Sequence, residues 1–381
     1  MSDLAPTPLI GIIRDRIGAA GGRIPFAEYM DLALYDPDYG YYSAGVVALG
    51  RGGDFTTSPE VDPAFGAALA VFARRCDAAL DHPPRFLLAE HGAGSGRLMA
   101  DLLTALRAAD PGLYTRLDAV VVERSPALQA RQAATLAAAG HAARMRWAAA
   151  TTGAGLVFSN ELLDAFAVHR VVHTAAGWVE IYVALAADGR FVEERGPLSD
   201  PALAAYFADL DLLPPLDQPC EVNLAAPAWL RGVAAGLERG FVLTIDYGDT
   251  AARLYSALRP AGTLLCYSGG RVTDDFYSAP GAQDMTAHVD FTTLERTGQA
   301  GGLETVAITR QMAFLVGLGL GEALAAVGAT PTADRAAYEA ALAQRTRLFR
   351  LIDPDALGRF HVLVQAKGVP RARWPAITVL G

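Results

Sequence analysis

The stretch of sequence that most constrains the fold is 86–96, Phe-Leu-Leu-Ala-Glu-His-Gly-Ala-Gly-Ser-Gly. An apolar run ends at an acid, Glu90, and Gly92, Gly94 and Gly96 follow at alternating positions. The residues after them have apolar side chains at helical spacing. This pattern predicts a strand, a glycine turn and a helix, as in an α/β protein. Such a turn lets a ligand approach the main chain, and the helix N-terminus faces that ligand.

The spacing of the glycines favours one kind of nucleotide site over another. Dinucleotide-binding proteins use Gly-x-Gly-x-x-Gly, whereas here the third glycine comes one residue earlier and an acid precedes the first by two positions. This arrangement resembles motif I of the class I S-adenosyl-L-methionine (SAM) methyltransferases. SAM carries a cationic amino group and a sulfonium, which suit the carboxylate of Glu90. A dinucleotide site and a glycine-rich turn that binds nothing are the alternatives, because short glycine motifs are weakly specific.

Composition and charge argue against several other classes. The 381 residues are 52% hydrophobic and 19% charged, as expected of a globular chain of one elaborated domain or two. The net charge of -9 argues against nucleic acid or an anionic membrane as the main partner. The three cysteines lie far apart, so we expect neither a disulfide framework nor a zinc cluster, and we expect no metal site. We also expect no secretory signal and no membrane span.

The N-terminal part is expected to be a helical cap. Two amphipathic helices and a tyrosine-rich loop are predicted over residues 8–17, 26–34 and 35–42. A Gly-Gly-Asp turn that ends at Asp54 leads to Thr57 and Ser58, and Ser58 is expected to cap a helix over about 60–80. Both the tyrosine loop and this turn are candidate lids over a ligand. A loop pinned by its own rings and a simple helix cap are the alternatives.

The next predicted strand also ends in an acid. Residues 117–122 are almost continuously apolar, as in a buried parallel sheet, and Glu123 follows them. In nucleoside-binding α/β folds an acid at this place binds the ribose hydroxyls. The spacing from the glycine turn is longer than usual, and an extra loop over 110–114 accounts for the difference. Glu123 is therefore the candidate ribose ligand, and a solvated strand end is the alternative.

A second cluster of polar residues follows a strand predicted over 155–159. Asn160, Glu161 and Asp164 come together at its carboxyl end, where open α/β sheets bind ligands. If residues 161–166 are helical, Glu161 and Asp164 share one face. Two acids on one face can hold a guanidinium through paired hydrogen bonds. A helix start whose acids favour the helix dipole is the alternative.

From residue 168 the pattern changes to alternation. Antiparallel strands are predicted over 169–172, 178–183 and 190–193. Residues 167–220 therefore form an inserted β-rich segment. The α/β pattern then resumes with a strand over 241–248 that contains Asp246, and the sheet is closed by strands over 303–309 and 360–365.

Together these residues resemble the MidA-like SAM-dependent methyltransferases, the bacterial relatives of a mitochondrial complex I assembly factor that methylates a protein arginine. The resemblance covers residues 24–291 and, more weakly, the C-terminal part. Its motifs recur in order at 29–35, 41–42, 53–60, 65–66, 90–96, 160–164, 246–248, 262–264 and 284–291. The chain departs from the family at His91 and Ala93, at Phe166 and Ala167, and in the loop 267–271, which lacks the family's His. The last departure bears on the substrate more than on the cofactor.

The resemblance implies a class I, Rossmann-like methyltransferase sheet with an N-terminal helical cap (1–85) and a core (86–381) interrupted by an antiparallel β-subdomain (167–220). It also implies SAM as cofactor and S-adenosylhomocysteine as product. Glu90, Gly92, Gly94 and Gly96 would hold the amino-acid end of SAM, and Glu123 the ribose. Asp54, Thr57 and Ser58 would close over the site from the cap.

For an arginine substrate, the guanidinium stays protonated in water and is a poor nucleophile. Glu161 and Asp164 would localise its charge on one nitrogen, with Asn160 orienting them. Asp246, His288 and Asp290 are second-rank candidates for binding the substrate. No metal is required.

The expected activity is therefore methylation of an accessible protein arginine, in a respiratory-complex subunit if the family is a guide, by a cytoplasmic bacterial enzyme. A small-molecule N- or O-methyltransferase is one alternative, and it predicts an enclosed apolar pocket. A SAM-binding assembly factor without turnover is the other, and it predicts tolerance of Glu161→Gln.

Overall fold

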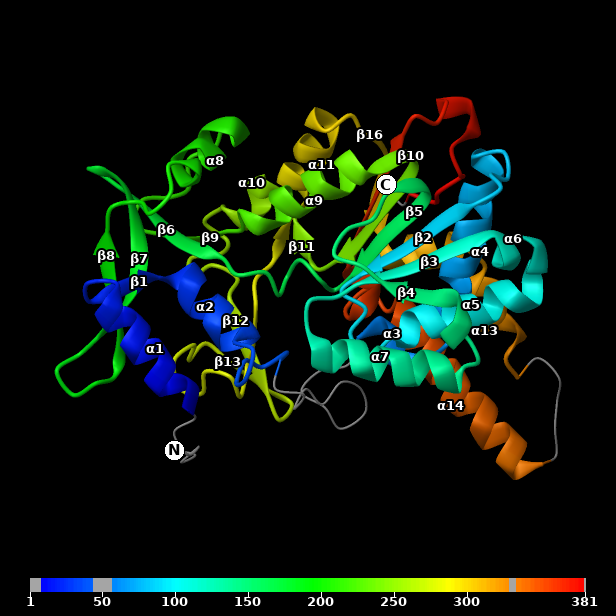
Figure 1. Cartoon of the computed structure of the whole chain (residues 1–381), viewed down its shortest axis with the longest axis horizontal. Coiled ribbons are helices and arrows are strands. Elements are labelled where there is room, and N and C mark those ends of the chain that lie inside the picture. Colours follow the sequence, from blue (N-terminus) through cyan, green and yellow to red (C-terminus); the bar gives the residue numbers. More distant parts are fainter. Residues whose placement is uncertain (1–7, 44–56, 329–333, 380–381) are drawn as a thin grey trace.

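The computed structural model describes residues 8–43, 57–328 and 334–379. Seven of the described strands form one mixed sheet (Figure 1). Their order across the sheet is β16 (Glu304–Arg310), β17 (His361–Lys367), β10 (Leu237–Asp246), β5 (Gly153–Asn160), β2 (Phe86–His91), β3 (Leu117–Val122) and β4 (Met145–Trp147). The five strands from β10 to β4 are parallel neighbours, and β17 is antiparallel to β10 and β16. Chain order reverses at β2, so a ligand site is expected where β2 and β5 end.

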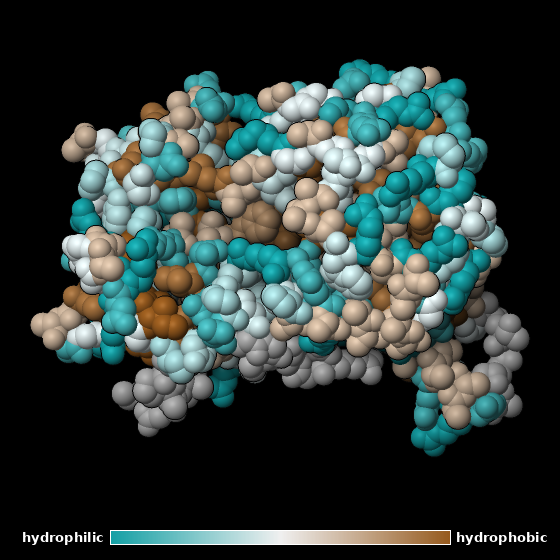
Figure 2. All heavy atoms as spheres, in the orientation of Figure 1, coloured by the Kyte–Doolittle hydropathy of each residue, from teal (hydrophilic) through white to brown (hydrophobic). Residues whose placement is uncertain are grey.

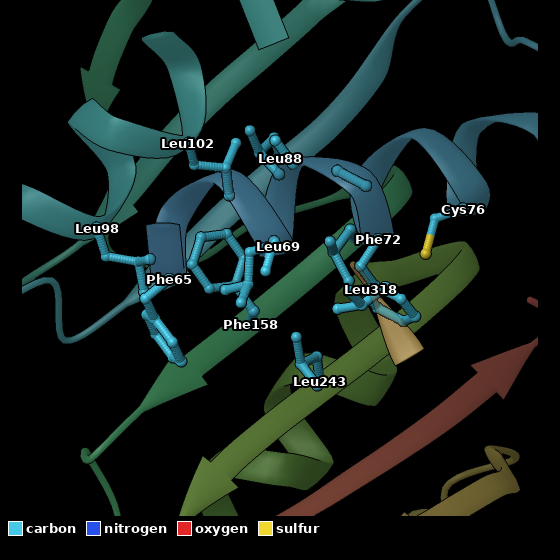
Figure 3. Close-up of a cluster of buried hydrophobic side chains, with 14 of the residues drawn as sticks. Phe65, Leu69, Phe72, Cys76, Leu88, Leu98, Leu102, Phe158, Leu243 and Leu318 are labelled. Carbon is cyan, nitrogen blue, oxygen red and sulfur yellow. The ribbon is translucent and has the colours of Figure 1, made fainter. Parts of the chain in front are cut away.

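The strand–turn–helix unit predicted at 86–96 is confirmed, because β2 leads through the glycines into α5 (Arg97–Ala109). One face of the sheet carries α5 with α4 (Ala64–Ala79), α12 (Gln311–Gly317) and α14 (Arg335–Ile352), and the other carries α9 (Ala225–Gly236) and α11 (Phe291–Ala300). Figure 3 shows Phe65 and Phe72 of α4 beside Leu88 and Phe158 of the strands. In β5, Phe158 faces this cluster and Val157 faces the opposite one. The strands are continuously apolar because both faces of the sheet are buried.

A second lobe holds the predicted antiparallel strands. Its sheet consists of β1 (Arg23–Pro25), β6 (His169–Thr174), β7 (Gly177–Leu185), β8 (Phe191–Gly196) and β9 (Pro219–Val222). The helices α1 (Pro8–Ala19) and α2 (Phe26–Tyr35) pack against it, and β1 pairs with β7 (Figure 1). On the face shown in Figure 2, hydrophobic residues lie recessed in a hollow near the middle, between hydrophilic rims.

The packing differs from the expected division of the chain at residue 85. Residues 8–43 belong with the inserted strands, since the backbone of β1 is bonded to β7 and the apolar sides of α1 and α2 bury against Val168 and Val183. In contrast, α3 (Ser58–Val61) and α4 pack on the main sheet side. The N-terminal segment thus contributes to both lobes.

The expected helix over 60–80 is broken into α3 and α4. Asp62 is extended, with φ of -159°, because it precedes Pro63, and a residue before proline is driven out of the helical region. Thr57, not Ser58, is the N-cap residue of α3. The extra loop expected over 110–114 is a short helix, α6 (Pro111–Arg116), whose first turn is capped by Asp110.

Smaller elements join the two lobes. Strand β11 (Gly248–Asp249) pairs with β15 (Val289–Asp290), and β12 (Leu265–Ser268) lies between β13 (Arg271–Thr273) and β14 (Asp284–Thr286). The other helices are α7 (Pro126–Ala138), α8 (Ala202–Leu210), α10 (Ala251–Leu254) and α13 (Leu320–Ala326). Within the described ranges, no helix combines the length and the apolar character needed to cross a membrane.

Candidate functional site

A cavity of about 590 Å³ lies at the carboxyl ends of β2, β3, β5 and β10. The loops after these strands form one part of its wall. Most of the rest comes from α2, α3, α9, β12 and β14 and from the segment 357–360. The cavity therefore lies where the main sheet meets the second lobe, at the place where strand order predicts a ligand.

The glycine turn after β2 is shaped by close packing as well as by its φ angles. Gly92, Gly94 and Gly96 have φ of 70°, 50° and 80°. A Cβ on Gly92 would lie 2.5 Å from Cδ1 of Leu162, and one on Gly96 would lie 3.0 Å from Cα of Gln132. Gly92 and Gly94 line the cavity, whereas Gly96 packs against α7 at the start of α5. The turn can thus present bare backbone to a ligand while the next segments hold it from behind.

Glu90 is a buried carboxylate at the edge of this cavity. It is 3% exposed, and its Oε2 has no hydrogen-bond partner within the described residues. Burial raises the pKa of Glu90 to about 8, although the main-chain N–H of Met99 partly opposes that change. A buried carboxylate that borders a cavity suits a cationic ligand. The positive charge of the ligand would compensate for the hydration that the carboxylate loses on burial.

Glu123, at the end of β3, also lines the cavity and is held more firmly. Its two oxygens accept the N–H of Ser125 at 2.9 Å and Nε2 of Gln132 at 3.1 Å. Burial raises the pKa of Glu123, and these bonds oppose the rise. Gln132 also donates to the carbonyl of Gly94 at 3.2 Å. Gln132 therefore links Glu123 to the glycine turn. The sequence did not predict this role for Gln132, a buried polar residue on the alanine-rich helix α7.

The acids after β5 lie on turns rather than on a helix, so the conditional prediction of a helix over 161–166 is wrong. Glu161 has φ of 50°, a left-handed conformation that is uncommon for residues other than glycine. Its Oε1 accepts Nδ2 of Asn160 at 2.9 Å and the N–H of Ser58 at 3.1 Å. Asn160, Glu161 and Asp164 nevertheless all line the cavity.

Burial dominates the electrostatics of this turn. It raises the pKa of Glu161 to about 8, with a further contribution from the charge of Asp164. It raises the pKa of Asp164 to about 6, and hydrogen bonding to the Tyr247 hydroxyl opposes that rise. Asp164 is 5% exposed, and its Oδ1 has no hydrogen-bond partner among the described residues, as is also true of Oδ1 of Asn160. The turn therefore presents unsatisfied acceptors to the cavity.

Asp246, at the end of β10, lies outside the cavity lining and supports this turn from behind. Its Oδ2 accepts the N–H groups of Leu162 and Leu163 at 3.2 and 2.9 Å, and its Oδ1 accepts the N–H of Tyr247 at 2.9 Å. Both oxygens are thus occupied by the main chain. The Asp246 carboxylate stabilises the turn, because it accepts hydrogen bonds from main-chain N–H groups that would otherwise be buried without a partner.

The remaining predicted site residues divide into two groups. Thr57 and His288 line the cavity, and burial lowers the pKa of His288 to about 4. Ser58 does not line it: its hydroxyl and the side chain of Gln311 exchange hydrogen bonds. Asp290 caps α11 through the N–H groups of Thr292 and Thr293 and accepts the hydroxyl of Tyr206 at 2.7 Å. Asp54 lies outside the described residues.

The cavity is also lined by residues that the sequence placed in a candidate lid or a motif but that were not among the predicted site residues. Tyr35 and Tyr42, from the predicted tyrosine loop, stack with ring centroids 5.4 Å apart. Tyr42 donates to Oδ1 of Asp284 at 2.8 Å, and Tyr35 donates to the carbonyl of Ala165 at 2.8 Å. The stacked rings fit a segment pinned by its own rings, and the lid stays a prediction. The signal for Asp284 was its place at the start of the motif 284–291.

No group of three or more His, Cys, Asp or Glu within the described ranges is arranged to hold a metal ion. His169 and His173 have the spacing His-x-x-x-His, but they lie on the strand β6 and have different neighbours. Nδ1 of His169 lies 2.7 Å from Glu180, and the ring of His173 packs on Trp178 with centroids 5.0 Å apart. In a strand, residues four apart share a face but lie about 13 Å apart, whereas in a helix they are neighbours about 5–6 Å apart.

Comparisons with known proteins agree with this geometry. The model of a family described as "Putative S-adenosyl-L-methionine-dependent methyltransferase" matches residues 68–309. The chain is 29% identical to the mitochondrial protein arginine methyltransferase NDUFAF7 of Mus musculus, over 93% of the chain and 83% of that relative. It is 28% identical to the Homo sapiens protein of the same name, over 82% and 74%. A Burkholderia thailandensis protein in a crystal structure with S-adenosyl-homocysteine bound is 36% identical, with a TM-score of 0.85 over 96% of this chain and 95% of that one.

Proposed function

The chain belongs to the family of SAM-dependent methyltransferases whose model it matches, and we propose that it methylates the guanidinium of a protein arginine. The observation that carries the proposal is the pair of acids after β5. Glu161 and Asp164 both line the cavity beside the glycine turn, and Asp164 keeps a buried oxygen without a partner among the described residues. Carboxylates paired in this way match the N–H groups of a guanidinium.

The residues at the ends of β2 and β3 fit the cofactor. Glu90 would hold the cationic amino-acid end of SAM, because its Oε2 lacks a partner within the described residues and the cavity borders it. Gly92 and Gly94 would leave the main chain open to the same end, and Glu123 would take the ribose. When bound, SAM supplies a methyl group on a sulfonium, ready for in-line displacement. The similar Burkholderia protein with bound S-adenosyl-homocysteine supports this use of the cavity.

The acids after β5 would prepare the nucleophile. A guanidinium is protonated in water, so its nitrogens lack a free lone pair. Burial raises the pKa values of Glu161 and Asp164 in the free protein. The positive charge of a bound guanidinium would lower these pKa values and favour the ionised forms. Hydrogen bonds to these carboxylates would concentrate the charge on two nitrogens and leave the third more nucleophilic. One carboxylate would then accept the proton that the methylated nitrogen loses.

The surroundings of Glu161 suit this role. Its Oε1 is held by Asn160 and by the start of α3, and within the described residues no hydrogen bond occupies its Oε2. One oxygen therefore fixes the side chain while the other is left for the substrate. Positioning is the main task of such a site, since methyl transfer depends on alignment of the nucleophile. The names of the NDUFAF7 relatives support arginine as the acceptor.

A small cationic molecule is the second candidate substrate. The burial of Asp164, which is 5% exposed, favours this candidate. A free guanidine or amine can enter a buried site without a peptide attached to it. An arginine side chain also reaches this depth, because three methylenes separate its charged group from the backbone.

The test uses SAM labelled in its methyl group, a library of arginine-containing peptides, the same peptides with lysine in place of arginine, and free agmatine. We expect label on the arginine peptides and none on the lysine peptides. Transfer to agmatine alone would favour a small cationic molecule as the substrate. SAM binding without transfer to any acceptor would contradict the proposal and favour an assembly factor. Asp164→Asn should transfer much less label to the arginine peptides than wild type does. Its matched control is Asp209→Asn, on the exposed surface of α8, which should transfer as much label as wild type.

A further inference from the structure

The hairpin-like pair β12 and β14 forms a second polar wall of the cavity. The strands are antiparallel, with Tyr267 opposite Asp284 and Leu265 opposite Thr286. Directly opposed residues lie on the same face of a sheet, and alternate residues along a strand share a face. All four of these residues line the cavity. The residues between them, Cys266 and Met285, are buried with α1 and α2 on the other face. Because of this alternation, Asp284, Thr286 and Tyr267 all face the cavity.

Hydrogen bonds set the orientation of Asp284. Its Oδ1 accepts the hydroxyl of Tyr42 at 2.8 Å and the N–H of Met285 at 2.9 Å, and the residue is 1% exposed. Tyr42 stacks on Tyr35, which donates to the carbonyl of Ala165 in the turn after β5. The tyrosines of the N-terminal segment therefore connect this wall to the turn that carries the proposed catalytic acids.

The same wall reaches Asp164 from the other side. Tyr247, Tyr267 and Thr286 line the cavity together with Asp164. The N–H of Ala287 donates to the main-chain carbonyl of Asp164 at 2.9 Å. Asp284 and Asp164 thus belong to one network, with aromatic rings between and beside them. The buried, unpartnered Oδ1 of Asp164, judged within the described residues, points to a ligand that donates hydrogen bonds.

From this arrangement we infer that Asp284, oriented by Tyr42, is a second substrate-binding carboxylate and that it makes the site prefer a guanidinium to a primary ammonium. This inference rests on the proposed function. A guanidinium is planar, and its five N–H groups point outward in fixed directions. It can therefore donate to carboxylates on two neighbouring walls while its faces contact tyrosine rings. An ammonium has three donors around one point and no face to stack, so it satisfies fewer of these groups.

The test measures binding of two probes to the protein saturated with S-adenosylhomocysteine: N-acetyl-L-arginine methylamide and N-acetyl-L-lysine methylamide. Asp284→Asn keeps an oxygen for Tyr42 and Met285, removes the charge and replaces the other acceptor oxygen with an N–H donor. We expect this variant to lose about tenfold in affinity for the arginine probe and most of its preference over the lysine probe. Its affinity for S-adenosylhomocysteine should stay within about twofold of wild type.

The control is Asp290→Asn, since Asp290 also accepts a tyrosine hydroxyl and main-chain N–H groups but lies outside the cavity. Equal affinity of wild type and Asp284→Asn for the arginine probe would overturn the inference and leave the proposed function standing. Absence of binding of this probe to wild type would overturn the proposed function itself. If Asp284→Asn does not fold, Tyr42→Phe decides the matter: it keeps the ring and removes the orienting hydroxyl, and an unchanged arginine preference would overturn the inference.

Discussion

The main-chain N–H of Ser58 donates to Oε1 of Glu161 at 3.1 Å, across 103 residues of sequence. This bond ties the start of α3 to the turn after β5. It also stabilises the ionised form of Glu161 and so opposes the increase in pKa that burial causes. The residue before Ser58 is Thr57, which lines the cavity. The position of α3 and the charge of the proposed catalytic acid are therefore coupled.

Glu161→Gln should separate chemistry from cofactor binding. Glutamine keeps an oxygen for Ser58 and Asn160 but cannot take a proton from the substrate. We expect the rate of methyl transfer to fall about 10²–10⁴-fold, the range typical for loss of a general acid or base. The dissociation constant for SAM should change little when it is measured calorimetrically. Glu238→Gln is the control, because Glu238 lies at the start of β10 and outside the cavity lining. Equal turnover in both variants would refute the role of Glu161.

Binding of SAM should release a proton from Glu90. Burial raises the pKa of Glu90 to about 8, so the side chain is mostly protonated at pH 7 in the free protein. A cationic ligand stabilises the carboxylate and lowers that pKa. Affinity for SAM should therefore rise as the pH increases from 7 to 9. Calorimetry in buffers of different ionisation enthalpy counts the released protons, and Glu90→Gln should abolish both effects. A proton count of zero in wild type would argue against contact between Glu90 and the positive charge.

The same acid should make the free protein less stable as the pH rises. The folded state holds the proton of Glu90 up to a pH of about 8, whereas the unfolded chain releases it near 4.5. The folded state thus binds more protons in this window, and the free energy of unfolding falls as pH increases through it. One such group contributes a slope of up to about 1.4 kcal/mol per pH unit. Urea unfolding at several pH values should show a shallower decline for Glu90→Gln than for wild type.

Gly92→Ala should damage the turn through a collision as well as through its backbone angle. The new methyl group would lie 2.5 Å from Cδ1 of Leu162, so the side chain of Leu162, the residue after Glu161, must shift. Gly21→Ala is a matched control, because Gly21 also has positive φ, 83°, but has nothing within 4 Å of an added Cβ. We expect the control to lose about 1–2 kcal/mol of stability and to bind SAM normally. Gly92→Ala should lose more stability and also bind SAM less tightly. Equal behaviour of the two variants in thermal unfolding and SAM titration would contradict the close packing.

Asp290→Ala should destabilise the protein without changing its chemistry. The substitution removes the cap of α11 and the acceptor for the Tyr206 hydroxyl. Loss of an N-cap costs about 1 kcal/mol, and a buried hydroxyl donor left without its acceptor adds about 1–3 kcal/mol. Asp290→Asn keeps the capping oxygen and should lose less. Chemical denaturation measures both values. A loss of SAM affinity or turnover in the folded variants would restore Asp290 as a candidate for the site.

The local features of this protein follow from its sequence. The strand, glycine turn and helix at 86–103 are present because hydrophobic runs and glycine spacing act over a few residues. The same holds for the acids at the ends of the strands: Glu90, Glu123 and Glu161 line the cavity since parallel strands end at one edge of a sheet. The antiparallel strands of the second lobe were also predictable from their alternation.

Contacts between distant segments decided the rest. The turns over 161–166 are held by Asp246, more than 80 residues away, which accepts the N–H groups of Leu162 and Leu163. Asp284 faces the cavity beside Tyr42, 242 residues earlier in the chain, and β1 joins the inserted sheet by pairing with β7. A local pattern cannot specify such partners, because a buried polar group is stabilised by whichever donor or acceptor the folded chain brings to it. The sequence therefore determined the edge of the cavity proposed to bind the cofactor, and the tertiary structure determined the wall proposed to face the substrate.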